Sequence, residues 1–124
     1  MGYQTNQNMR QVQINFDLYS GTEDVDFKLE LIMLMIANVD ELIKAASEAS
    51  AYKNLQVFNK AVHKSKSTVG LLNDAEFTES IYAFRNHLEE HNETPDVLLK
   101  SFHELCASII QSLEQEAALL KAQL

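Results

Sequence analysis

Apolar residues recur at helical spacing along most of the chain, and polar breaks divide this pattern into four segments. The first helix is expected to begin between Ser20 and Asp24, where Ser20 and Glu23 have capping-box spacing, and to run to about Ala46. Its apolar stripe is wide, which predicts a helix packed on more than one side. The stripe consists of Val25, Phe27, Leu29, Leu31, Ile32, Leu34, Met35, Ile36, Val39, Leu42 and Ile43, with Met33 as further core filler.

A turn is expected at Ser47 to Ser50, followed by a second helix from about Ala51 to Leu72. Asn73 and Asp74 then supply a helix stop and the N-cap of a third helix. The inward positions of the second helix are Leu55, Phe58, Val62, Ser65, Val69 and Leu72.

The third helix is expected to end near Asn92, before Thr94, Pro95 and Asp96 provide the cap, first-turn proline and acid of a new helix start. Four amphipathic helices with short connections predict an all-α antiparallel four-helix bundle over residues 20–124. The inward positions are Phe77, Ile81, Phe84 and Leu88 in the third helix, and Leu98, Phe102, Leu105, Ile109, Leu113, Leu120 and Leu124 in the last.

The chain before the bundle, residues 1–19, is expected to form a tail and a lead-in. Met1 to Gln11 is polar, whereas Val12 to Phe16 alternates apolar and polar residues but is too short and isolated for a strand assignment. We expect residues 12–16 to be extended and to pack on the bundle.

Composition favours helices over a turn-rich β fold, because the chain has one proline and three glycines. The longest apolar run, Leu31 to Ala37, is far shorter than the roughly 20 residues that a membrane span needs. The N-terminus lacks the pattern of a secretory signal. The single cysteine, Cys106, allows no internal disulfide and is expected in the core as a small hydrophobe. We therefore expect a cytoplasmic protein that does not enter the membrane.

Charge is distributed unevenly. The net charge of −8 argues against nucleic acid as the main partner, because phosphate backbones are bound by basic surfaces. Residues 49–73 contain four lysines and no Asp or Glu, while the rest of the chain holds 6 basic and 18 acidic residues. A basic stretch therefore stands in an acidic protein.

His63 lies in this basic stretch, and no apolar residue shares its face of the expected helix. The residues at helical spacing from His63 are Gln56, Asn59, Lys60, Lys66, Ser67 and Gly70. We expect His63 to point to solvent from a rigid helix, with small residues after it that leave the imidazole open to a partner.

The residues His63-Lys64-Ser65-Lys66-Ser67 resemble the H-x-x-K-G signature of histidine-containing phosphotransfer (HPt) domains. Members of that family are four-helix bundles of about this length with the histidine at the middle of the second core helix. The chain departs from the family at two glycine positions, where it has Ser67 and Asn73.

The resemblance implies a role for each matching residue. His63 would be the phosphorylated residue, and Lys66 would neutralise the phosphoryl group. The residues around His63 would serve docking and access of a partner, and either Arg85 or Asn86 on the next helix would orient the imidazole. The docking set comprises Gln56, Asn59, Lys60, Lys64, Ser67 and Gly70.

The implied function is that of a phosphorelay intermediate in two-component signal transduction. His63 would accept a phosphoryl group from the aspartyl phosphate of a response-regulator receiver domain, or of a hybrid histidine kinase, and pass it to another receiver. Mg²⁺ would come with the receiver, so the chain itself needs no cofactor. We expect a monomeric phosphoryl carrier, not an autonomous enzyme.

Two other functions compete with this hypothesis. His87-Leu88-Glu89-Glu90-His91 has the H-x-x-E-H spacing of inverted zinc-protease helices, although no third ligand is evident in the sequence. Alternatively, the apolar spacing through Leu120 and Leu124 is compatible with a helical adaptor or dimerisation module that is never phosphorylated.

His103, beside Phe102, is interpreted as a residue at the core boundary.

Overall fold

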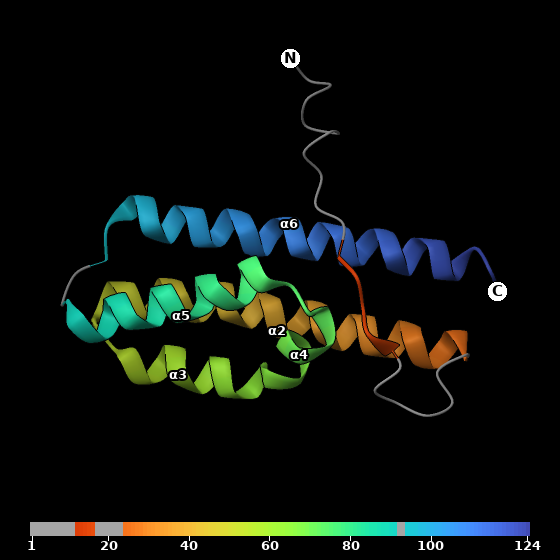
Figure 1. The fold of residues 1–124 in the computed structure, drawn as a ribbon, viewed down its shortest axis with the longest axis horizontal. Coiled ribbons are helices and arrows are strands. Elements are labelled where there is room, and N and C mark those ends of the chain that lie inside the picture. The colour runs from red at the N-terminus through yellow and green to blue at the C-terminus, as the bar shows by residue number, and fades with distance from the viewer. Residues whose placement is uncertain (1–11, 17–23, 92–93) are drawn as a thin grey trace, which may run out of the picture.

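The computed structural model describes residues 12–16, 24–91 and 94–124, and all regular elements in these ranges are helices (Figure 1). The all-α expectation is confirmed. The described part has five helices where four were expected, because the second helix is interrupted. The helices are α2 (Val25–Tyr52), α3 (Leu55–Lys64), α4 (Lys66–Leu72), α5 (Ala75–Glu90) and α6 (Asp96–Lys121).

Helix α2 begins at Val25, one residue after the interval expected for its start, and it ends later than expected. Asp24 caps it, with Oδ1 accepting hydrogen bonds from the N–H groups of Asp26 and Phe27. The turn expected at 47–50 is wrong, because the alanines of this region stay on the buried face and the helix continues over them. The helix ends at Lys53, whose φ of 54° is left-handed. The capping box expected at Ser20 and Glu23 falls outside the described residues.

The second expected helix starts at Leu55, where Asn54 Oδ1 accepts from the Gln56 N–H, and it breaks at Ser65. The Ser65 hydroxyl donates to the Val62 carbonyl at 3.0 Å, and the Ser65 N–H is shared between the carbonyls of Ala61 and Val62. A serine hydroxyl that bonds the preceding turn competes with the regular backbone ladder. Helix α4 therefore turns away from the line of α3 (Figure 1).

The boundary between α4 and α5 is as predicted. Asn73 ends α4 with a φ of 48°, and Asp74 caps α5 by accepting from the Phe77 N–H. Helix α5 ends at Glu90, and Asn92 is outside the described residues. At the start of α6 the expected cap is displaced by one residue, because Pro95 itself occupies the N-cap position and no side chain caps the helix.

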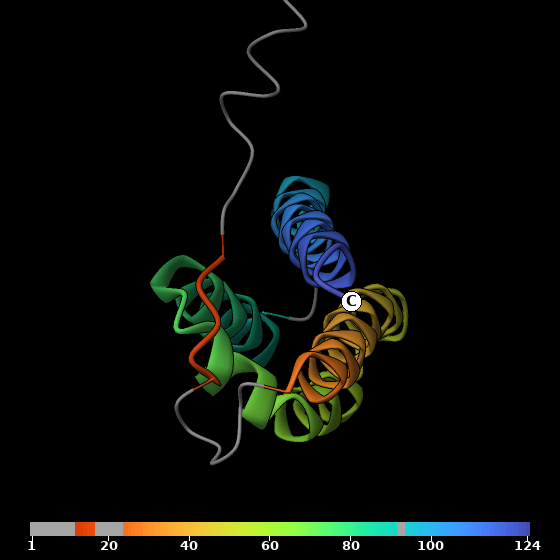
Figure 2. The same cartoon turned by 90° about the vertical axis from the view of Figure 1, so that its right-hand side faces the viewer.

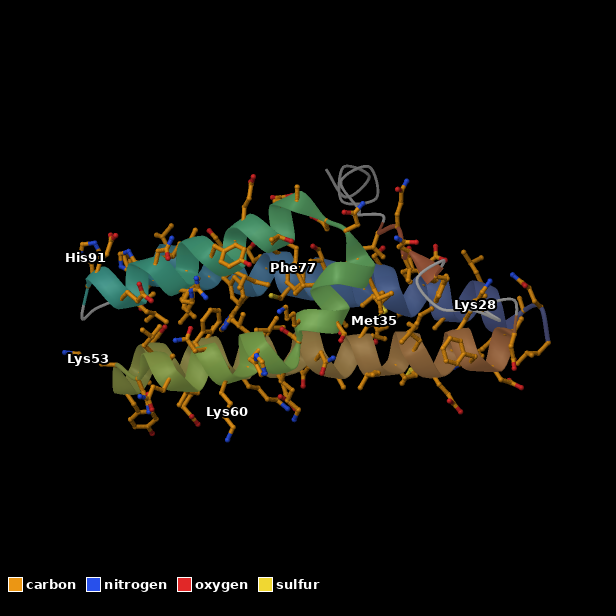
Figure 3. The ribbon with its side chains drawn as sticks, turned by 60° about the horizontal axis from the view of Figure 1, so that its bottom comes forward. Lys28, Met35, Lys53, Lys60, Phe77 and His91 are labelled. Carbon is orange, nitrogen blue, oxygen red and sulfur yellow. The ribbon has the colours of Figure 1, made fainter. Side chains whose placement is uncertain are left out.

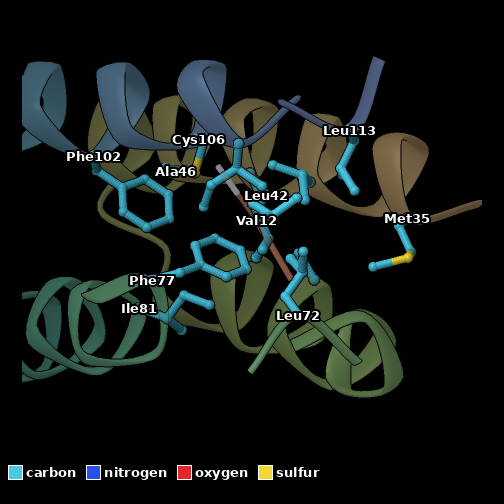
Figure 4. Packing of buried hydrophobic residues seen from close by; sticks show 14 of the residues in the cluster. Val12, Met35, Leu42, Ala46, Leu72, Phe77, Ile81, Phe102, Cys106 and Leu113 are labelled. Atoms are coloured by element: carbon cyan, nitrogen blue, oxygen red, sulfur yellow. The ribbon is translucent and has the colours of Figure 1, made fainter. Parts of the chain in front are cut away.

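Seen end-on, α2, α3, α5 and α6 surround a common centre (Figure 2). Three aromatic rings meet there, with centroid separations of 4.9 Å for Phe58 and Phe84, 5.7 Å for Phe58 and Phe102, and 5.1 Å for Phe84 and Phe102. Figure 4 shows further core side chains from α2, α4, α5 and α6 converging. A buried hydrogen bond of 2.7 Å from Asn38 Nδ2 to Thr68 Oγ1 ties α4 to α2.

The lead-in at residues 12–16 packs on the helices, as expected. Val12 is buried, and its N–H donates to Ser112 Oγ at 2.9 Å. The Asn15 N–H donates to the Leu71 carbonyl at 2.8 Å. The short helix α4 and the long helix α6 are thereby linked through this segment, which bonds Leu71 of α4 and Ser112 of α6.

Most single-residue expectations about the core are correct. Met35 and Cys106 are fully buried, and burial raises the pKa of the Cys106 thiol to about 12. Met33 and Leu34 are more than half exposed, so the expected stripe of α2 is too wide at these positions. Leu124 also lies exposed beyond α6. No helix in the described ranges combines the length and the apolar character needed to cross a membrane.

Candidate functional site

His63 lies in the last turn of α3, and its side chain is exposed as predicted. It lines an open cavity of about 340 Å³ between α3, the start of α4 and α5. Among the described residues, no carboxylate lines this cavity. The lining residues are Asn59, Val62, His63, Lys66, Tyr82 and Arg85.

Lys66 is the first residue of α4 and reaches the cavity of His63 despite the break at Ser65. It is exposed, and no ion pair with a carboxylate forms at Lys66 within the described ranges. The lysine that the sequence singled out is thus beside His63 and carries its charge without a neutralising partner there.

Arg85 and Tyr82 complete the cavity from α5. The Arg85 guanidinium lies over the Tyr82 ring, 5.1 Å from its centroid, where a cation–π contact holds it. Of the two orienting candidates, Arg85 shares the cavity with His63, whereas Asn86 is exposed and does not line it. Tyr82 was missed from the sequence, although its position three residues before Arg85 on one helix face was a signal that could have found it.

Two side chains that line this cavity each carry a buried polar atom that has no hydrogen-bond partner among the described residues. The two atoms are Oδ1 of Asn59 and Nε of Arg85. Buried polar atoms normally have partners, so each such atom calls for an explanation. Both side chains line the cavity of His63, one from α3 and one from α5.

Lys60 and Lys64 belong to the opposite side of α3, which faces α2. Lys64 Nζ forms an ion pair of 2.9 Å with Glu41 Oε1, and Lys60 lines the same groove, together with Glu41 and Glu48. Figure 3 shows Lys60 projecting from α3 on the side away from α5. The stretch that is free of acids in the sequence therefore has acids beside it in space.

The remaining residues of the docking set are all exposed: Gln56, Ser67 and Gly70. Gly70 lines a second open cavity of about 410 Å³ between α4 and the start of α5. A Cβ added at Gly70 would meet nothing within 4 Å, so the protein itself does not require glycine there.

The other histidines have different surroundings. His87 and His91 lie one turn apart at the end of α5, with ring centroids 4.5 Å apart. No group of three or more His, Cys, Asp or Glu side chains is placed to hold a metal within the described residues. His103 is half-buried, and a 3.0 Å hydrogen bond joins its Nε2 to Ser47 Oγ, which agrees with the expected boundary position.

No protein-family model matches the chain, and no curated protein or solved structure matches it. The chemistry of the site therefore has to be argued from its own residues. An exposed imidazole beside two cations, with no carboxylate in the cavity, suits a nucleophile that takes on an anionic group.

Proposed function

We propose that the protein is a phosphoryl carrier of the HPt type, with His63 as the acceptor. The observation that carries this proposal is the cavity in which an exposed imidazole shares its walls with Lys66 and Arg85 and with no carboxylate of the described part of the chain. Phosphoryl transfer depends mainly on positioning and on neutralising the charge of the transferred group, and the cavity supplies both.

The transfer step needs little from the protein beyond this arrangement. The unprotonated ring nitrogen of His63 forms a bond to the phosphorus of an aspartyl phosphate. The bond between phosphorus and the aspartyl oxygen breaks, and the aspartate leaves as a carboxylate with the electron pair. Lys66 stabilises the charge on the phosphoryl oxygens. The reverse step returns the group to a second receiver, with Mg²⁺ supplied by the receiver.

The architecture is compatible with this role. We treat α3 and α4 as one interrupted helix, which gives the antiparallel four-helix bundle of the HPt type. The break at Ser65 lies between His63 and Lys66 and preserves their common cavity. The proposed partner is a response-regulator receiver domain or a hybrid histidine kinase in the cytoplasm, and the proposed carrier acts as a monomer.

The test is incubation of the protein with a receiver domain phosphorylated on its aspartate. We expect transfer of a phosphate that is labile to acid and stable to alkali, and its loss in His63→Gln. His103→Gln is the matched control, because His103 is half-buried and bonded to Ser47. If no receiver transfers the label, or if His63→Gln is still labelled, the proposal is wrong.

A further inference from the structure

The two unpartnered atoms of the side chains that line the His63 cavity have opposite hydrogen-bonding character. Oδ1 of Asn59 can only accept a hydrogen bond, whereas Nε of Arg85 can only donate one. A neutral imidazole has one N–H donor and one nitrogen that accepts, and a phosphoryl group on that second nitrogen offers acceptors alone. The side chains that line the cavity thus include one with an acceptor suited to the ring and one with a donor suited to the transferred group.

Arg85 cannot orient the ring for attack. A guanidinium has no acceptor, so it could bond the imidazole only by donating to the unprotonated nitrogen. That nitrogen is the nucleophile, and a donor there would block it. The residue that orients the ring must therefore accept a hydrogen bond from its N–H.

Asn59 is placed to do this. It lies one turn before His63 on α3, at the i−4 position, and both side chains line the same cavity. Side chains on a helix lean toward its N-terminus, so the His63 ring is directed over the turn that carries Asn59. Asn59 Oδ1 has no hydrogen-bond partner among the described residues, so it is available to accept one from Nδ1, the ring nitrogen nearer the backbone.

We propose that Asn59 is the positioning residue of His63 and that Arg85 is a second residue that binds the phosphoryl group. Asn59 Oδ1 accepts the Nδ1–H and fixes the tautomer in which Nε2 is unprotonated and faces the opening. The guanidinium of Arg85, which lies over Tyr82, donates to a phosphoryl oxygen beside Lys66. The role of Arg85 rests on the proposed function, whereas the tautomer of His63 does not.

The role of Asn59 is tested on the unphosphorylated protein by ¹⁵N NMR of the imidazole nitrogens at a pH where His63 is neutral. We expect one dominant tautomer, protonated on Nδ1, in the wild type and in Asn59→Asp, which keeps an acceptor. In Asn59→Leu the two tautomers should be mixed, and the ratio of the Nδ1-protonated to the Nε2-protonated form should fall at least threefold. Gln56→Leu, an exposed change on the same helix, should match the wild type. An unchanged tautomer ratio in Asn59→Leu would overturn this role.

The role of Arg85 is tested with phosphoramidate, a small donor that needs no receiver. Its P–N bond breaks and ammonia leaves as the bond from phosphorus to His63 forms. We expect Arg85→Gln to slow labelling of His63 about tenfold and Arg85→Lys to restore part of the rate. Lys100→Gln, an exposed cation on α6, is the control. Equal rates for Arg85→Gln and wild type would overturn the role of Arg85.

The two failures are distinguishable. If His63 takes label from phosphoramidate but from no receiver, the relay function is wrong. The role of Arg85 is then decided by the labelling rates of Arg85→Gln and the wild type with phosphoramidate. If His63 takes label from neither donor, the relay function and the role of Arg85 are both wrong. The role of Asn59 is decided by NMR in either case.

Discussion

The two sides of α3 carry similar residues in the sequence and differ in space. On the side toward α5, His63 shares a cavity with Lys66 and Arg85, and no carboxylate in the described ranges lines that cavity. On the side toward α2, Lys64 pairs with Glu41 at 2.9 Å, and Glu48 lines the same groove. One basic stretch of sequence is thus divided into a side whose cations share a cavity with each other and a side where Lys64 is paired with a glutamate.

This difference shows why a run of lysines is an incomplete guide to a binding site. Charges on one helix are compensated or left free by the helices that pack beside it. The α5 side has an arginine where the α2 side has glutamates. We therefore expect the two sides to respond differently to the same substitutions.

Reversing one charge on each side should give the largest difference. Lys66→Glu places a carboxylate in the cavity of His63, where it repels the phosphoryl group, and we expect receiver-to-His63 transfer to slow at least about 100-fold. Lys64→Glu should slow it less than about threefold, because Lys64 is already paired with Glu41. Rapid-quench transfer kinetics measure both rates, and equal losses would contradict the comparison.

A larger side chain should also affect the transfer rate differently on the two sides of α3. Under the proposed function, Ser67→Leu is expected to slow transfer from a receiver about tenfold, because Ser67 is exposed one turn after His63 and a larger side chain there hinders approach. Ser67→Gly should transfer at least as fast as the wild type. Lys60→Leu, on the α2 side, is the control. Labelling by phosphoramidate should not change in Ser67→Leu, and a parallel loss there would indicate damage to His63 itself.

The core beneath both sides contains a second nucleophilic group, Cys106, which should affect stability only at alkaline pH. Its pKa is raised from 9.0 to about 12 by burial, so the folded state resists formation of the thiolate. Below pH 9 the thiol is neutral in both the folded and the unfolded protein, so it does not lower the free energy of unfolding. As the pH rises from 9 toward 12, only the unfolded protein ionises there, and the free energy of unfolding decreases. At pH 10 the loss is about 1.4 kcal/mol, and urea unfolding of Cys106→Ala should show a shallower pH dependence by that amount.

Gly70→Ala should raise the stability of the protein and lower the rate of phosphoryl transfer from a receiver. The added Cβ meets nothing within 4 Å, and alanine is the better helix former, so we expect a gain of about 0.5–1 kcal/mol in the free energy of unfolding. If a receiver approaches over this part of α4, phosphoryl transfer from that receiver to His63 should be a few-fold slower in Gly70→Ala than in the wild type. Loss of stability in Gly70→Ala would contradict the open space at this position.

The smallest effect is expected on the α2 side. Glu41→Gln removes the partner of Lys64 but leaves both side chains in water, since they are 46% and 64% exposed. The free energy of unfolding should fall by no more than about 1 kcal/mol. Transfer to His63 should stay within about twofold of the wild type, and a larger change would show that the two sides of α3 are coupled.

Much of the helical pattern was predictable, because local chemistry decides it. Asp24, Asn73 and Asp74 act through their own side chains or backbone within a few residues, so their roles could be read from sequence. The turn expected at 47–50 was wrong because the serines there have weak local preferences, and burial of Ala46 and Ala49 against the core outweighed them. The break at Ser65 was missed because the sequence pattern marks Ser65 only as a small inward residue. The pattern does not show that its hydroxyl bonds the Val62 carbonyl.

The sequence by itself determined the all-helical class, the exposure of His63 and the helix on which it lies, since helical periodicity and capping act over one or two turns. Only the tertiary structure decided which further cation stands beside His63 and Lys66. Arg85 reaches their cavity from α5, and Lys64 is neutralised by Glu41 from α2. Contacts between residues distant in the chain depend on how the helices pack, and periodicity along one helix carries no information about its neighbours.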